Sequence, residues 1–244
     1  MILKFLHVIG LTNLSDADVE KYYATATARL NVTTVYDEAM TGGASGVKRM
    51  LDFFASLILL ILFFPLFVVV AVLIKATSRG PIFFIQDRIG SNKRRFSFYN
   101  FRSMFKDAER RLDEIEYLKN GSGPIFKIID DPRITPVGRF LIKTSIDELP
   151  ELFNVLKGDM SLVGPRPLSV RDYQQLDKDW QRRRFSVRPG LTCYWRLQRG
   201  SGIPIEKEME LDTQYIEYWT LWLDLKLLLK TISVLKNSAL LGKG

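Results

Sequence analysis

The chain has only one cysteine and one histidine among its 244 residues. A single cysteine, Cys193, cannot form an intrachain disulfide, and there is no cysteine cluster to hold zinc. This composition fits a reducing compartment, and Cys193 is expected to be a small buried residue. His7 lies in a short apolar N-terminal piece, so we assign it no catalytic role.

The sequence also lacks a recognisable cleavable signal peptide and any internal repeat. Its apolar start, "MILKFLHVIGL", is short and is interrupted by Lys4 and His7, so we expect no cleaved leader. Residues 1–46 are expected to form a weakly structured or small helical extension. This extension ends in "TGGASG", whose glycines are typical of a linker.

What the sequence has in quantity is apolar and basic side chains. Hydrophobic residues make up 47% of the chain, enough for the core of one domain. There are 35 Lys and Arg against 27 Asp and Glu, a net charge of +8. This excess favours an anionic partner, namely lipid headgroups, nucleic acid or a phosphorylated substrate.

One unbroken apolar run, "LILLILFFPLFVVVAVLI" at residues 57–74, is long enough to cross a bilayer as a helix. Basic residues flank it on both sides, with Lys48 and Arg49 before it and Lys75 and Arg79 after it. The positive-inside rule would place both ends in the cytoplasm, and Pro65 removes a helical hydrogen bond at mid-segment. These features leave two structures open, a kinked spanning helix and a re-entrant hairpin.

Several elements are predicted after this segment. Residues 78–90 and 94–104 alternate apolar and polar side chains, as half-buried strands or loop edges do, and residues 104–120 are typical of a surface helix. A helix is expected to end near Gly158, followed by a strand over 160–164. Residues 211–236 form one long amphipathic pattern, which predicts either a core helix or a helix lying among lipid headgroups.

The stretch "TSIDELPELFNVLKGDMSLVGPRP", residues 144–167, carries the strongest chemical signal. Ser145 and Glu148 match a capping box, and Asp147 is an alternative helix cap, because Pro150 would then fall in the first turn. A second interpretation is catalytic. An ionised Asp147 could attack phosphorus, and Glu148 beside it could hold Mg²⁺.

The order of motifs resembles the bacterial sugar transferase family, the monotopic polyprenyl-phosphate phosphoglycosyl transferases. The matching pieces run from about Lys48 to Lys236 and are "KRMLDFFASLILL", "SRGPIFFIQDRIG", "FRSM", "DPRITPVGRFL", "TSIDELPELFNVLKGDMSLVGPRP", "VRPGLT" and "LDTQYIEYWTLWLDLKLLLKT".

The resemblance implies an α+β fold with four parts. They are the extension and linker at 1–46, a re-entrant membrane helix broken at Pro65 over 47–76, a small cytosolic catalytic domain with interfacial amphipathic helices over 77–236, and a C-terminal tail at 237–244. It places the protein on the cytoplasmic face of the bacterial inner membrane, in contact with its lipids. It leaves a homodimer open.

The resemblance also implies a reaction and its residues. Sugar-1-phosphate would pass from a UDP-sugar to undecaprenyl phosphate with release of UMP, a step that begins exopolysaccharide or lipopolysaccharide synthesis. Asp147 would be the nucleophile and Glu148 would hold the Mg²⁺ or assist the acceptor, with Asp147 near the same metal. The substrate-binding set would be Arg88, Arg102, Arg166, Arg188 and Asp212.

Three positions depart from the family pattern. Phe64 replaces the usual serine before the proline, Asn100 replaces a lysine expected near the phosphates, and Cys193 replaces a glycine. Asn100 and Phe64 would suit a rival function, that of a membrane-bound interaction protein without turnover. A nucleic-acid binder is disfavoured, because the arginines fall in phosphate-site motifs rather than on a recognition helix.

Overall fold

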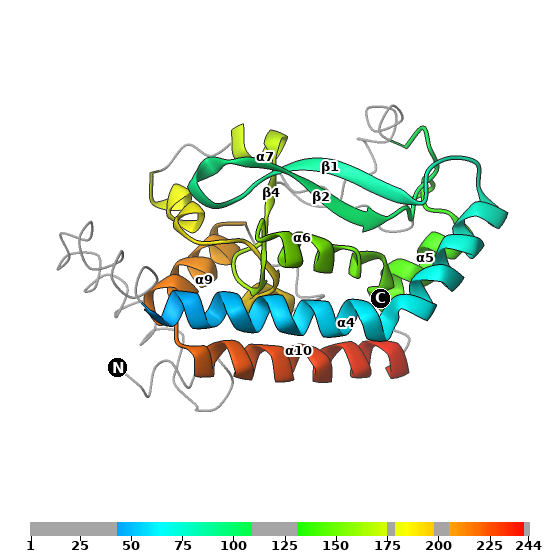
Figure 1. The fold of residues 1–244 in the computed structure, drawn as a ribbon. Coiled ribbons are helices and arrows are strands. Elements are labelled where there is room, and N and C mark those ends of the chain that lie inside the picture. Colours follow the sequence, from blue (N-terminus) through cyan, green and yellow to red (C-terminus); the bar gives the residue numbers. More distant parts are fainter. Residues whose placement is uncertain (1–42, 109–130, 175–178, 198–204, 242–244) are drawn as a thin grey trace. The chain divides into compact units, whose positions relative to one another are not determined.

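A computed structural model describes residues 43–108, 131–174, 179–197 and 205–241 of the chain. The described residues combine helices with two small sheets (Figure 1), which confirms the α+β class. The extension at 1–42 and most of the helix predicted at 104–120 lie outside these ranges. Residues 105–108 are not helical, and Met104 instead forms an isolated β-bridge with Ile134.

Helix α4, Gly43–Thr77, contains the whole apolar run and begins within the predicted linker. It is long and apolar enough to cross a membrane, with a mean hydropathy of 3.4 over its best window, of which only 17% is buried. Pro65 lies inside it and cannot donate a hydrogen bond to the preceding turn. The ribbon of α4 changes direction along its length (Figure 1), as a helix does at an internal proline.

The last third of α4 packs into the protein. Phe67, Val70 and Ile74 form a buried cluster with Phe101 and Leu141. Before this part, α4 leaves many large apolar side chains exposed, including Met50, Leu51, Phe54, Ile58, Ile61, Leu62 and Phe64. An apolar surface of this extent marks a site of contact with lipid or protein.

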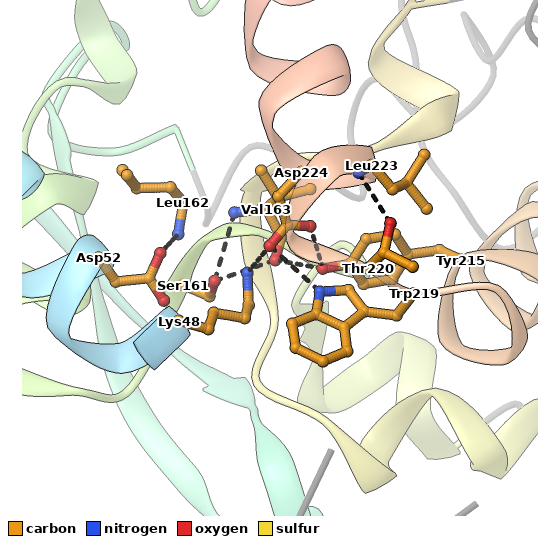
Figure 2. A network of polar contacts seen from close by, with 10 residues as sticks. All are labelled: Lys48, Asp52, Ser161, Leu162, Val163, Tyr215, Trp219, Thr220, Leu223 and Asp224. Atoms are coloured by element: carbon orange, nitrogen blue, oxygen red, sulfur yellow. Dashed lines mark hydrogen bonds and ion pairs between the residues drawn. The ribbon is translucent and has the colours of Figure 1, made fainter. Parts of the chain in front are cut away.

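Polar residues fasten the first turns of α4 to the rest of the fold. Lys48 forms a 2.5 Å ion pair with Asp224, and Asp52 accepts a hydrogen bond from the backbone N–H of Leu162 (Figure 2). Arg49 donates to the carbonyl oxygens of Val155 and Leu156 at 2.6 and 2.7 Å. These are among the last carbonyls of a short helix, where cations are favoured.

The main sheet is a three-stranded antiparallel sheet in the order β2-β1-β4. β1, Phe83–Ile89, and β2, Arg95–Phe101, form a hairpin through η1, Ser91–Lys93, and β4 is the short strand Leu168–Ser169. The predicted strands over 78–90 and 94–104 are thereby confirmed. The sheet presents β1 and β2 side chains toward the segment that holds the Asp-Glu pair.

That segment runs through α5, Pro136–Thr144, η3, Ile146–Glu148, and α6, Glu151–Lys157. Helix α6 packs directly against α4 and ends at Gly158, whose φ of 94° gives the left-handed C-cap that favours glycine. β3, Ser161–Val163, follows as predicted and pairs in parallel with β5, Gly190–Thr192.

The remaining elements complete the described fold. They are α7, Val170–Gln174, η4, Asp179–Ser186, α8, Tyr194–Leu197, α9, Ile205–Glu217, and α10, Leu221–Leu241. The single amphipathic element predicted over 211–236 is wrong, because a break at 218–220 separates α9 from α10. Trp219 at this break is buried, as the core interpretation expects, whereas Trp222 is 61% exposed, and its place among lipid headgroups stays a prediction.

Candidate active site

The Asp147–Glu148 pair lies on a short 3₁₀ turn between two helices. Ser145 ends α5 with a φ of 58°, a left-handed conformation that is uncommon outside glycine, and turns the chain into η3. Three residues per turn separate adjacent side chains by about 120°, so the two carboxylates point in different directions.

Neither capping interpretation of this segment is correct. Helix α6 begins at Glu151 with Pro150 in the cap position, and no side chain caps it. Ser145 makes no side-chain cap hydrogen bond with η3 either. The acidic pair is therefore not explained by helix capping, which was the alternative to a chemical role.

A cavity of about 80 Å³ opens beside Glu148. It joins residues from β1, β2, η3, α6, β5 and α8 with the loop before β4. Its charged lining consists of three guanidinium groups and two carboxyl groups, from Arg88, Arg166, Arg196, Glu148 and Glu151. Asn100 from β2 also lines it.

Arg88 is fixed in this cavity by the sheet. Its Nη1 donates to the carbonyl oxygen of Pro167 at 2.8 Å, and its guanidinium stacks on the ring of Phe98, 4.5 Å from the centroid. Burial and, to a smaller extent, the neighbouring Arg166 lower the pKa of Arg88 to about 10. At neutral pH Arg88 is still a cation. Burial and the like charge of Arg166 disfavour its charged form, so an anion bound beside it would stabilise that form.

Glu151 lies one helical turn after Asp147 and is fully buried. Burial raises the pKa of its carboxyl well above the usual range, Asp147 raises it too, and Arg88 and Arg166 oppose this. Three guanidinium groups thus line the cavity against two carboxyl groups, and burial disfavours the charged form of one of these, Glu151. The cavity therefore carries net positive charge, which suits a phosphate.

The backbone around Arg166 is held by a close contact between two loops. Gly164 N–H donates to Thr192 at 3.0 Å and Gly190 N–H donates to Pro165 at 2.8 Å. A Cβ at Gly190 would lie 2.0 Å from the backbone nitrogen of Gly164, so no larger residue fits there. The glycines of "VGPRP" and "VRPGLT" are thus required for the approach that places Arg166.

Behind this loop Arg184 connects Arg166 to a buried acidic pair. Arg184 Nη2 donates to the Arg166 carbonyl oxygen at 2.8 Å and forms a 2.6 Å ion pair with Asp212. Burial raises the pKa of Asp212 to about 7, with Arg184 opposing and Glu208 adding to the rise. Asp212 thus contacts Arg184 behind the loop and is not among the residues that line the cavity.

Besides Asp212, two more of the predicted substrate-binding residues lie outside this cavity. Arg102, at the end of β2, donates to the carbonyl and the hydroxyl of Ser78 at 2.9 and 2.5 Å, and lines a separate cavity of about 520 Å³. Arg188 is exposed and lines a third cavity of about 190 Å³, together with Lys48. The structure brings Arg88 and Arg166 to Glu148 but not Arg102 or Arg188.

Sequence reasoning missed Arg196, Arg184 and Glu151. The signal for Glu151 was its spacing of four residues from Asp147, one helical turn. Arg196 lies on the short helix α8, which begins two residues after "VRPGLT". Its Nη2 forms an ion pair with Glu148. Only the fold reveals that contact, since 48 positions separate the two residues in sequence.

The donor set is compatible with Mg²⁺ bound jointly with a substrate. No group of three or more acidic, His or Cys side chains within the described ranges is placed to hold a metal ion. Mg²⁺ needs fewer, because it is usually bound through one or two carboxylates together with phosphate oxygens and water. Asp147 and Glu148 are the residues that would supply those carboxylates.

Arg166→Ala and Arg102→Ala are expected to have different effects, although the motifs suggested that both arginines meet phosphates. Arg166→Ala should lower turnover of a phosphorylated substrate by about 10- to 100-fold, because it would remove the charge-assisted phosphate contact that the motifs suggest. It should leave thermal stability nearly unchanged. Arg102→Ala should lower the melting temperature instead, because it frees the end of α4 from β2. Thermal unfolding and turnover of both variants measure this difference, and equal losses of both quantities in the two variants would contradict it.

This chain is similar to known proteins over most of its length. Residues 43–238 match the model of the bacterial sugar transferase family. Galactosyl transferase CpsE from Streptococcus agalactiae is 46% identical over 68% of this chain and 36% of its own length. An Aeromonas hydrophila UDP-N-acetylgalactosamine-undecaprenyl-phosphate N-acetylgalactosaminephosphotransferase is 34% identical over 94% of this chain and 54% of its own length.

Exopolysaccharide production protein ExoY from Rhizobium meliloti is 36% identical over 76% of this chain and 83% of its own length. The chain thus spans about half or less of the first two relatives but most of the third. The match of the family model covers α4 and every strand and helix of the described fold up to residue 238. This chain belongs to the bacterial sugar transferase family.

Proposed function

We propose that this protein transfers sugar-1-phosphate from a UDP-sugar to undecaprenyl phosphate and so begins the synthesis of a polysaccharide or glycoconjugate. The observation that carries the proposal is the cavity beside the Asp-Glu turn, in which three guanidinium groups converge within a chain of this family. The name of the Aeromonas relative contains both a UDP-sugar and undecaprenyl phosphate, which supports the same substrate classes for this chain.

The proposed chemistry has two steps at one phosphorus atom. A carboxylate oxygen of Asp147 attacks the β-phosphorus of the UDP-sugar, an Asp–O–P bond forms, and the bond from phosphorus to the bridging oxygen breaks, releasing UMP. A phosphate oxygen of undecaprenyl phosphate then attacks the same phosphorus. The Asp–O–P bond breaks, the carboxylate is restored, and the product is a polyprenyl diphosphate sugar.

The charged residues have distinct roles in these steps. Arg88 and Arg166 neutralise phosphate oxygens, so that an anionic nucleophile can approach an anionic phosphoryl group. Mg²⁺ held by Asp147 and Glu148 with the donor phosphates would supply further charge neutralisation. Burial raises the pKa of Glu151 and so favours its neutral form, which would repel the donor less than a carboxylate.

The membrane surface is proposed from two apolar faces. The exposed side chains of α4 form one, and Trp222, Leu225, Leu229 and Ile232 form a stripe of exposed apolar residues along α10. Lys48 and Asp224 join these two helices at one point. In the proposed arrangement α4 enters the inner membrane from the cytoplasmic side and returns near Pro65, and α10 lies among the headgroups.

Incubation of the purified full chain with undecaprenyl phosphate, Mg²⁺ and a panel of UDP-sugars tests the activity. We expect UMP release with at least one sugar and a new lipid diphosphate sugar. A folded protein that releases no UMP with any sugar of the panel would instead favour a membrane-bound interaction protein of the same fold, the alternative that the uncharged Asn100 suits.

Both ends of α4 are expected on the cytoplasmic face. Single cysteines at Ala44 and Ala76, both exposed, should react with a membrane-impermeant maleimide from the same side of inverted vesicles. Cys193 is buried and provides a low labelling background. Labelling of the two positions from opposite sides would show that α4 crosses the membrane.

A further inference from the structure

Arg196 is the cavity residue that no motif indicated. It lies on α8 directly after β5, and its side chain is buried. Its Nη1 donates to the carbonyl oxygen of Leu191 at 2.9 Å, and its Nη2 forms an ion pair with Glu148. These two contacts aim the guanidinium into the cavity, next to one member of the acidic pair.

Asn100 approaches the same cavity from β2. With its side-chain amide in the orientation that satisfies its neighbours, the nitrogen donates to Glu151 Oε1 at 3.3 Å and to the backbone oxygen of Tyr99 at 2.8 Å. It contributes no charge. Position 100 on β2 therefore brings no positive charge to this cavity. Arg196 brings one from α8 instead.

The balance of charge indicates what Arg196 would bind. Three guanidinium groups and two carboxyl groups line the cavity, so cations outnumber anions in its lining. An anion that enters the cavity can contact all three guanidinium groups, and charge-assisted contacts of this kind suit phosphate oxygens.

We propose that Arg196 is a donor-phosphate ligand and supplies, from α8, the positive charge that Asn100 does not supply from β2. The proposal rests on the proposed function and names a binding residue of the same site. In the absence of donor, Glu148 holds Arg196 in place. When the diphosphate enters, the planar guanidinium of Arg196 contacts its oxygens, and Glu148 is released for its own role.

The test measures the binding of UDP to the full chain by isothermal titration calorimetry, without turnover. Arg196→Gln should weaken UDP binding about tenfold or more, because one charge-assisted contact is lost. Arg196→Lys keeps the charge and should weaken it less. Arg139→Gln is the matched control. Arg139 is exposed on α5, so its replacement removes the same charge at a position outside the cavity.

A second substitution tests whether a positive charge at position 100 can take over the proposed role of Arg196. Asn100→Lys in the Arg196→Gln background should restore most of the lost affinity. Asn100 lines the same cavity as Arg196, so a lysine at position 100 extends from the wall of that cavity. A role of Arg196 limited to packing or to orienting Glu148 would not be repaired by a lysine on β2.

The outcomes separate the two proposals. Unchanged UDP binding by a folded Arg196→Gln variant would overturn the role of Arg196 as a ligand, and weakened binding without rescue by Asn100→Lys would overturn the claim that a positive charge at position 100 can take over this role. If the wild-type chain binds UDP but releases no UMP from any UDP-sugar, the proposed activity fails while the binding series still decides the role of Arg196.

Discussion

Asp147→Asn is expected to give a folded protein that forms no sugar-phosphate adduct and releases no UMP. The amide has nearly the size of the carboxylate but is a poor nucleophile, and the covalent step has no substitute group. Turnover should fall by about 10³-fold or more, as it does when a catalytic nucleophile is removed. Because Asp147 caps no helix, its replacement should cost little stability.

The measurement is made without acceptor. Wild-type protein mixed with UDP-sugar and Mg²⁺ should gain the mass of one sugar phosphate and release an equal amount of UMP, and Asp147→Asn should do neither. Glu148→Gln is the matched control on the same turn, since it should slow turnover and change the Mg²⁺ dependence while leaving Asp147 open to modification. A folded Asp147→Asn variant with near wild-type transfer would refute the proposed mechanism.

The sequence was sufficient for those elements in which local pattern and tertiary structure agree. The β1–β2 hairpin follows from alternation between glycines, and α6 ends at Gly158 because glycine accepts the left-handed cap conformation. The apolar run of α4 is visible by length and composition alone. Cys193 was expected to be buried and is.

The sequence failed where long-range contacts decide. The pattern at 211–236 is continuous in hydrophobicity, yet the chain breaks after Glu217 and places Trp219 inside, where its indole N–H donates to Asp224. Likewise, local rules suggested a capping box at Ser145, whereas the left-handed turn there separates α5 from η3. Motif position could not tell Arg166, which lines the cavity, from Arg102, which does not.

A second large effect is expected at the network around Asp224 (Figure 2), none of whose members lines the cavity of the proposed chemistry. Asp224 Oδ2 accepts from Lys48 at 2.5 Å and from Trp219 Nε1 at 3.1 Å, and Oδ1 lies 2.8 Å from the hydroxyl of Tyr215. Burial raises the pKa of the Asp224 carboxyl, and the Lys48 ammonium opposes that rise. The network therefore ties the start of α4 to α10 and α9 through one buried carboxylate.

Asp224→Ala should destabilise the protein by about 3 kcal/mol or more, because it leaves the largely buried Lys48 charge and the buried indole N–H of Trp219 without their acceptor, while Tyr215 keeps the carbonyl oxygen of Val163. Thermal or denaturant unfolding in detergent or nanodiscs measures this loss. The informative control is the pair Lys48→Met and Asp224→Leu. Since replacement of both charges by apolar side chains is often close to neutral, the double variant should be more stable than Asp224→Leu alone.

A cost of Asp224→Ala within about 0.5 kcal/mol of zero, the range of ordinary surface substitutions, would contradict this account. The ion pair would then not hold α4 on the domain. A large cost has a consequence for function, because α4 also packs on α6, which directly follows the turn that carries Asp147. Loosening the first turns of α4 should then lower transfer to a membrane-embedded acceptor more than it lowers adduct formation from a soluble UDP-sugar.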